Sequence, residues 1–152
     1  MLLPSKEQEL SWYKVEEPKM WEYFLPSLNK WLTLFQAIDK VVQANGRGLT
    51  TIKDYTVVNV GKVFRSCGNC SKNGGPRNVI ITGLKANGVN ADVVGINSNF
   101  GDVATISGSC GKGIKHVCQE FTGIVKNGSQ ESPKVSTTAN CKGAQSQAIP
   151  AC

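Results

Sequence analysis

The residues of this 152-residue chain whose type and spacing could do chemistry are, first, its cysteines. Cys67 and Cys70 have the C-x-x-C spacing that zinc sites and thiol–disulfide oxidoreductases share. A zinc site needs about four ligands, but a glycine-rich turn separates the next pair, Cys110 and Cys118. Thioredoxin-like chemistry needs a βαβ context, which the sequence lacks. We therefore favour structural disulfides with open connectivity, and the candidates are Cys67, Cys70, Cys110, Cys118, Cys141 and Cys152.

Other chemical patterns are weaker. His116 is the only histidine, and we expect it in a solvent-exposed loop, so no Ser-His-Asp arrangement can be built. The formal net charge of +6 would attract a polyanion. Nucleic-acid binding also needs stacking aromatic side chains among the basic ones, and the basic half has few, so no nucleic-acid partner is expected. Asn127-Gly128-Ser129 has the N-x-S pattern of a glycan acceptor.

Cysteine usage and the first residues indicate different compartments. An even set of cysteines in a small, loop-rich chain is typical of secreted proteins. A secretory signal needs an apolar run of roughly 7–15 residues, whereas MLLPSKEQEL offers three apolar residues and then charges. We predict a secreted protein and interpret the conflict as an N-terminus that is missing or altered. No stretch approaches ~18 consecutive apolar residues, so no membrane span is expected.

The composition changes near Gln36, which predicts a domain boundary. Seven of the 11 aromatic residues fall within residues 1–36, and all 16 glycines lie at or after Gly46. Apolar residues of the first segment recur at spacings of three and four, which predicts a helix with one apolar face. These residues are Leu25, Leu28, Trp31, Leu32, Phe35 and Ile38. We predict an atypical helical segment over 1–36 and a β-rich domain over 37–152.

Beyond the boundary the pattern is typical of short strands rich in Val, Ile and Thr, separated by Gly and Asn. The runs cover residues 51–60, 78–84, 92–98, 102–107 and 120–126. Roughly 22–27 residues for each strand–turn–strand unit suits a parallel β-solenoid, and a β-sandwich fits the spacing equally well. Asparagines tolerate left-handed turns, so a structural role at solenoid corners is expected for Asn59, Asn87, Asn90, Asn97 and Asn99.

One segment resembles the signature of the small (family 3) polysaccharide lyases, the compact pectate lyases. It runs from Asp39 to Cys70 as DKVVQANGRGLTTIKDYTVVNVGKVFRSCGNC. In that family DKV-Q-x-N-G is followed by TIK-x-x-x-V and then by GK-x-x-R-x-CG-x-C. Further strings match in the family's order: VGINSNFGD (94–102), GSCGKG (108–113), VCQEF (117–121) and NCKGA (140–144). The resemblance covers about residues 37–152 and does not extend to residues 1–36.

The resemblance implies both a fold and an activity. The fold would be all-β, a right-handed parallel β-helix, with the unrelated helical segment capping its open end. The activity would be calcium-dependent β-eliminative cleavage of (1→4)-linked galacturonan in plant cell-wall pectin. The enzyme would be a secreted monomer whose partner is polygalacturonate, a polyanion with one carboxylate per sugar.

The family's catalytic and substrate-binding basic residues, carried over position by position, fall on Lys40, Lys62 and Arg65. Lys40 and Lys62 are 22 residues apart, about one coil, so they would stack on adjacent coils of one face. Lys62 and Arg65 are three apart, so the chain must bend between them, and Gly61 offers a place for that distortion. Lys62 or Lys40 is the preferred base, because Arg holds its proton more tightly, and Arg65 would clamp the uronate carboxylate.

The sequence departs from the family at the calcium site. That site draws on a Glu-Asp…Glu-Asp stretch upstream of the DKV segment, and residues 21–36, WEYFLPSLNKWLTLFQ, stand in its place. Calcium remains the implied cofactor, with Asp39 as the candidate ligand among the matched residues. The domain over 37–152 would then be truncated on its N-terminal side. The alternative is a catalytically inactive homologue that only binds acidic polysaccharide, and a fragment that does not fold stably is a third interpretation.

Overall fold

The computed structural model describes residues 13–15, 33–35 and 37–152. In chain order its strands are β1 (Tyr13–Val15), β2 (Thr33–Phe35), β3 (Lys40–Ala44), β4 (Gly48–Lys53), β5 (Thr56–Val60), β6 (Lys62–Ser66), β7 (Arg77–Thr82), β8 (Lys85–Asn97), β9 (Ala104–Ser107), β10 (Cys110–Phe121) and β11 (Cys141–Lys142). A single turn of 3-10 helix, η3 (Ser98–Phe100), follows β8. Over these residues no helix is long and apolar enough to cross a membrane.

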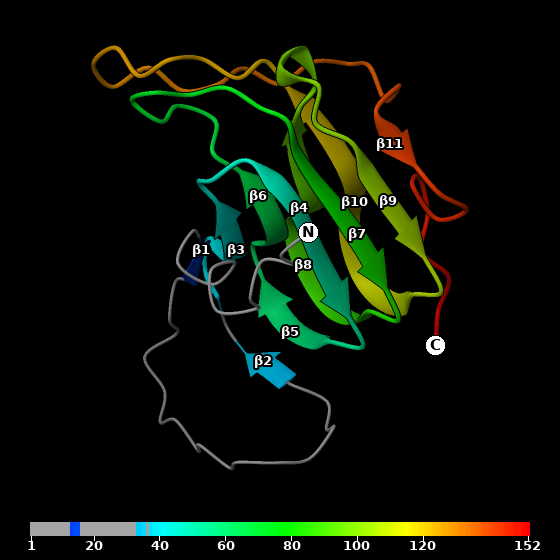
Figure 1. The fold of residues 1–152 in the computed structure, drawn as a ribbon. Helices are drawn as coiled ribbons and strands as arrows, with labels where there is room; N and C mark the ends of the chain where they lie inside the picture. Colours follow the sequence, from blue (N-terminus) through cyan, green and yellow to red (C-terminus); the bar gives the residue numbers. More distant parts are fainter. Residues whose placement is uncertain (1–12, 16–32, 36) are drawn as a thin grey trace, which may run out of the picture.

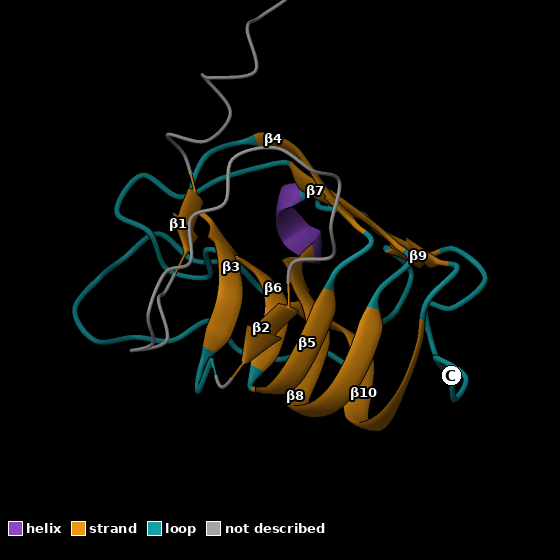
Figure 2. Ribbon diagram, turned by 90° about the horizontal axis from the view of Figure 1, so that it is seen from below, coloured by secondary structure: helices purple, strands orange, loops and turns teal. Residues whose placement is uncertain are grey.

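Two sheets of stacked strands form the molecule (Figure 1). The larger has the order β1-β3-β6-β8-β5-β2, with β10 also on β8, and the smaller has the order β11-β9-β7-β4. Figure 2 shows β4, β7 and β9 lying across the larger sheet. Apart from the antiparallel β1–β3 pair, the described strands pair in parallel between coils, as β4 does with β7 and β7 with β9. This pairing makes a parallel β-helix, since the strands of a β-sandwich run antiparallel.

Aliphatic side chains from both sheets fill the interior of the coils. Along β7 burial alternates from residue to residue, as a strand with one inward face requires. The largest fully buried apolar side chains include Val57, Val60, Phe64, Ile81, Leu84, Val89, Ile96 and Ile106. Each coil stacks its inner face on the next, so residues one coil apart become neighbours on the outer surface as well.

The predicted strand runs are present, with shifted ends. The run over 51–60 divides into β4 and β5, with Asp54 at a φ of 57° between them, and Asn59 adopts a φ of 53° as expected of a corner asparagine. The run over 120–126 is wrong beyond Phe121, because the chain leaves the sheet there. Most of β10 was not predicted, because its glycines and lysines interrupt the alternation of apolar residues that is typical of a strand.

The predicted helix over 1–36 lies mostly outside the described residues. The two described pieces correct it at their positions, since residues 13–15 and 33–35 are strands. In β2, Thr33 pairs in parallel with Thr56 of β5. An available sheet edge supplies backbone hydrogen bonds that override a helical apolar period. Ile38, the last residue of the apolar stripe, is 94% exposed.

All six cysteines form disulfides, which confirms the structural interpretation. The bonds are Cys67–Cys70, Cys110–Cys152 and Cys118–Cys141. A cysteine in a disulfide has no thiolate to offer to zinc. Cys118–Cys141 joins β10 to β11 and so closes the long segment between them, residues 122–140, which we call the strap.

We expect replacement of Cys118 and Cys141 by serine to lower the free energy of unfolding by about 3 kcal/mol, because the bond closes a long loop. Denaturant unfolding under oxidising conditions measures this loss. Cys67→Ser with Cys70→Ser is the matched control, since that bond spans a sequence separation of 3 rather than 23 and should cost less. Equal losses for the two pairs would contradict the loop-closure explanation.

Candidate functional site

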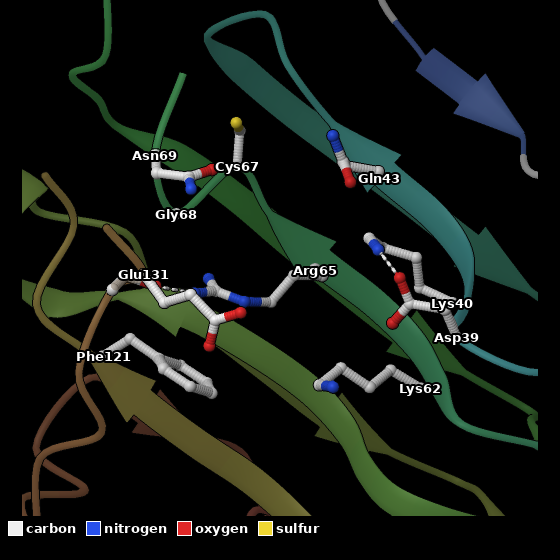
Figure 3. A pocket seen from close by; sticks show the side chains of 11 residues that line it. Asp39, Lys40, Gln43, Lys62, Arg65, Cys67, Gly68, Asn69, Phe121 and Glu131 are labelled. Atoms are coloured by element: carbon white, nitrogen blue, oxygen red, sulfur yellow. Dashed lines mark hydrogen bonds and ion pairs between the residues drawn. The ribbon is translucent and has the colours of Figure 1, made fainter. Parts of the chain in front are cut away.

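A pocket of about 280 Å³ gathers the basic residues that the sequence singled out. Its walls come from β3, β6, the loop after β6, the end of β10 and the strap (Figure 3). The lining residues are Asp39, Lys40, Gln43, Lys62, Arg65, Cys67, Gly68, Asn69, Phe121, Glu131 and Ser132. The structure therefore brings Lys40, Lys62 and Arg65 together in one concave site.

The register between β3 and β6 stacks the two lysines. Lys40 lies opposite Lys62 on adjacent coils, as their spacing predicted. The coils touch closely just before this pair: the Gly61 N–H donates to the Ala37 carbonyl at 2.8 Å. A Cβ atom at position 61 would lie 2.2 Å from the Asp39 carbonyl oxygen, so only glycine fits there. The backbone contact at Gly61 thus positions both lysines.

Lys62 and Arg65 both line the pocket although they lie three residues apart on β6. Val63 and Phe64 are consecutive and both buried, with 1% and 0% exposure. A regular strand would place one of them outside and would send Lys62 and Arg65 to opposite faces. Burial along β6 thus departs from simple alternation, and Gly61 serves the close approach of the coils.

The two lysines differ in their partners. Lys40 donates from Nζ to Asp39 Oδ2 and forms an ion pair with it. Lys62 has no hydrogen-bond or ion-pair partner among the described residues, and its ammonium group points into the pocket (Figure 3). Lys62 is thus the lysine whose donors are available to a ligand.

Arg65 is held on several sides at once. Its Nη1 donates to the Ser66 carbonyl at 2.7 Å and to Asn97 Oδ1 at 3.0 Å, and its Nη2 donates to Ser132 Oγ at 2.6 Å. The guanidinium carbon lies 3.9 Å from the centre of the Phe121 ring, in cation–π contact. These contacts fix a buried side chain that is 7% exposed at the pocket wall.

Burial lowers the pKa of Arg65 to about 10, because a low-dielectric environment disfavours the charged guanidinium. The carboxylates of Asp102 and Asp92 act in the opposite direction but do not offset the burial. Arg65 remains a cation at neutral pH. A cation that is poorly solvated and fixed in position attracts a carboxylate more strongly than one in open water.

Sequence reasoning missed several residues that contact Arg65. Asn97 was assigned a structural role at a corner, yet it accepts a hydrogen bond from Arg65. Its place in the family string VGINSNFGD was the one available signal. Phe121 and Ser132 carried no chemical pattern, because their contacts with Arg65 arise from folding of the strap over the coils.

His116 lies in β10, which corrects the prediction of a loop. Its side chain is half exposed, and its Nδ1 is 3.6 Å from Oδ1 of the buried Asp92. His116 is not among the residues that line the pocket.

The donor set of the pocket does not fit a calcium ion. The described part of the chain contains no group of three or more His, Cys, Asp or Glu side chains that could hold a metal. Asp39 and Glu131 are the acidic lining residues, and they approach from opposite sides (Figure 3). Calcium takes about 6–8 oxygen ligands, and the carboxylate of Asp39 already pairs with Lys40.

The fold and the basic pocket define the chain as a parallel β-helix protein suited to an acidic ligand. The family model described as Pectate lyase matches residues 33–128, from β2 to the first part of the strap. The chain therefore belongs to the pectate lyase family.

Curated relatives agree with this assignment. The probable pectate lyase E of Neosartorya fischeri is 49% identical over 107 residues, which cover 70% of this chain and 41% of the relative. Pectate lyase E of Emericella nidulans is 45% identical over 107 residues with the same shares. The chain thus spans about two fifths of the length of these relatives.

Solved structures confirm the fold. The catalytic domain of pectate lyase PelI from Erwinia chrysanthemi matches with a TM-score of 0.67 and 36% identity, over 79% of this chain and 59% of that one. PelI in complex with tetragalacturonic acid matches with a TM-score of 0.64 and 38% identity, over 78% of this chain and 42% of that one.

Proposed function

We propose that this chain binds polygalacturonate in the pocket formed by Lys40, Lys62 and Arg65 and cleaves it by β-elimination. The observation that carries the proposal is the register that stacks Lys40 on Lys62 and turns Arg65 into the same pocket. Membership of the pectate lyase family supports it, as does the PelI complex with tetragalacturonic acid.

The reaction would divide the work among three basic residues. The C5 proton of a uronate is weakly acidic, and its removal builds negative charge toward the adjacent carboxylate. Arg65 would clamp and neutralise that carboxylate. Lys62 would take the proton in its neutral amine form, because Lys62 has no described partner while Lys40 is paired with Asp39. The C5–H electrons then form the C4–C5 double bond as the C4–O bond breaks. The leaving sugar oxygen would take a proton from water or from the Lys62 ammonium formed in the first step.

Calcium dependence, secretion and the monomeric state belong to the same proposal. Calcium is implied by the family; Asp39 is the candidate ligand among the matched residues, and the other ligands would have to come from the substrate or from outside the described pocket. Three disulfides support secretion, because such bonds persist in oxidising compartments.

A second candidate is a silent homologue that binds acidic polysaccharide without cleaving it. The absence of a three-ligand acidic cluster among the described residues favours it. The basic pocket would serve either function, because both need attraction of a polyanion.

When the purified protein is mixed with polygalacturonate and calcium, we expect the absorbance to rise as unsaturated product forms. Addition of a chelator should abolish the signal, and co-sedimentation with the polymer measures binding separately. A neutral polysaccharide of similar size is the control. Retention of polygalacturonate without product would support the binder, and failure both to bind and to cleave would contradict both functions.

A further inference from the structure

The strap places the hydroxyl of Ser132 within hydrogen-bond distance of Arg65. This contact suggests how Arg65 is held in the pocket without a carboxylate partner. We propose that Ser132 and Asn97 are positioning residues that hold Arg65 between neutral acceptors, so that its positive charge is left for a substrate carboxylate. The inference rests on the proposed function. Ser132 lies beyond the matched residues 33–128, so the family match does not cover it.

Every described acceptor of Arg65 is uncharged: a backbone carbonyl at Ser66, the carboxamide of Asn97 and the hydroxyl of Ser132. No described carboxylate forms an ion pair with the guanidinium. Buried charged side chains are normally paired with an opposite charge. Arg65 is therefore a buried cation with its hydrogen bonds partly satisfied and its charge uncompensated by direct contact.

The carboxamide of Asn97 is fixed in one orientation. Its Nδ2 donates to the Cys67 carbonyl at 2.9 Å, which leaves Oδ1 to accept from Arg65 at 3.0 Å. The backbone N–H of Asn97 donates to Oδ2 of the buried Asp102 at 2.9 Å. Asn97 is itself fully buried. Because each polar group has its own partner, the acceptor cannot move away from Arg65 without breaking a buried bond.

Two segments of the chain, the strap and the loop after β6, fix the position of Ser132. On the strap side, the Thr122 N–H donates to the Pro133 carbonyl at 2.9 Å. On the coil side, Gly68 leaves the space: a Cβ at that position would lie 2.2 Å from Ser132 Oγ and 2.7 Å from Arg65 Nη2. Any larger residue at 68 would push the hydroxyl and the guanidinium apart.

The carboxylates of the pocket do not take over this role. Asp39 pairs with Lys40, and Glu131 lines the pocket from the strap without pairing with Arg65. An acidic side chain at position 132 would differ from both, because its carboxylate would lie beside the place where Ser132 Oγ now accepts a hydrogen bond from Arg65.

Ser132→Asp is the decisive variant, and Ser129→Asp is its matched control, an equal charge at an exposed position of the same strap. Binding of tetragalacturonate is measured by calorimetry, and stability by thermal unfolding. Ser132→Asp should weaken binding at least about tenfold, because the new carboxylate would form an ion pair with Arg65 and neutralise its charge. The melting temperature should stay level or rise. Ser129→Asp should bind almost as the unchanged protein does.

Two further variants separate positioning from bulk structure. Ser132→Thr keeps a hydroxyl acceptor and should retain both affinity and turnover. In an Arg65→Ala background, Ser132→Asp should change affinity no more than Ser129→Asp does, because the charge it would neutralise is gone.

The proposal is overturned if both aspartate variants bind equally well, or if Ser132→Asp loses affinity together with a lower melting temperature. A tenfold difference in affinity between Ser132→Asp and Ser129→Asp that persists in the Arg65→Ala background would also overturn the proposal. Failure of the unchanged protein to bind or cleave polygalacturonate is a different result, because it removes the proposed function and this proposal with it.

Discussion

Replacement of Lys62 by alanine is expected to lower the rate of polygalacturonate cleavage by about 10²–10⁴-fold, the usual contribution of a general base. Lys62 lines the pocket without a described partner, opposite Lys40 and on the same strand as Arg65. Its neutral amine is therefore the group best placed to take a proton from a sugar held by Lys40 and Arg65. The rate of appearance of unsaturated product measures the loss.

Lys53→Ala is the matched control for this experiment. Lys53 is an exposed lysine on β4, in the smaller sheet, so its removal changes the net charge equally without touching the pocket. Cleavage by Lys53→Ala should stay within about twofold of the unchanged protein. An active enzyme that tolerates Lys62→Ala would remove Lys62 from the role of base, and Lys40→Ala would then be the next variant to measure.

Glu120→Ala is expected to lower the free energy of unfolding by about 3 kcal/mol, because two hydrogen bonds to a buried carboxylate are lost. Glu120 is 1% exposed. Its Oε2 accepts from Thr137 Oγ1 at 2.6 Å, and its Oε1 accepts from the Asn140 N–H at 2.6 Å. Glu120 thus anchors the C-terminal part of the strap to β10.

Urea unfolding measures the stability of this variant beside Glu131→Ala, which removes an exposed carboxylate from the same strap. Glu131→Ala should change stability by less than about 0.5 kcal/mol. Because the strap also carries Ser132, Glu120→Ala should impair binding of tetragalacturonate as well. Similar stability losses for the two variants would mean that the buried anchor is not what holds the strap.

The sequence predicted β4, β5, β7, β9 and part of β8, and it predicted the stacking of Lys40 on Lys62, whereas β3, β6 and most of β10 lay outside the predicted runs. Both predictions follow from local features, since Val- and Ile-rich runs favour strands and a separation of about one coil places residues side by side. The pairing of the cysteines could not be predicted from the sequence, because it depends on which coils and loops lie side by side in the fold. Residues 33–35, inside the apolar stripe that predicted a helix, form a strand instead, since the sheet edge outweighed the apolar period.

The surroundings of Arg65 came from the tertiary structure alone. Asn97 is 32 residues away along the chain and Ser132 is 67 residues away, and Ser132 lies in the strap, outside the stacked strands, so no strand pattern predicts these contacts. Local sequence sets which residues prefer an extended backbone and how long a coil is. Only packing of the strap across the coils decides which neutral groups surround a buried cation, because that choice is made by contacts between segments with no periodic relation to each other.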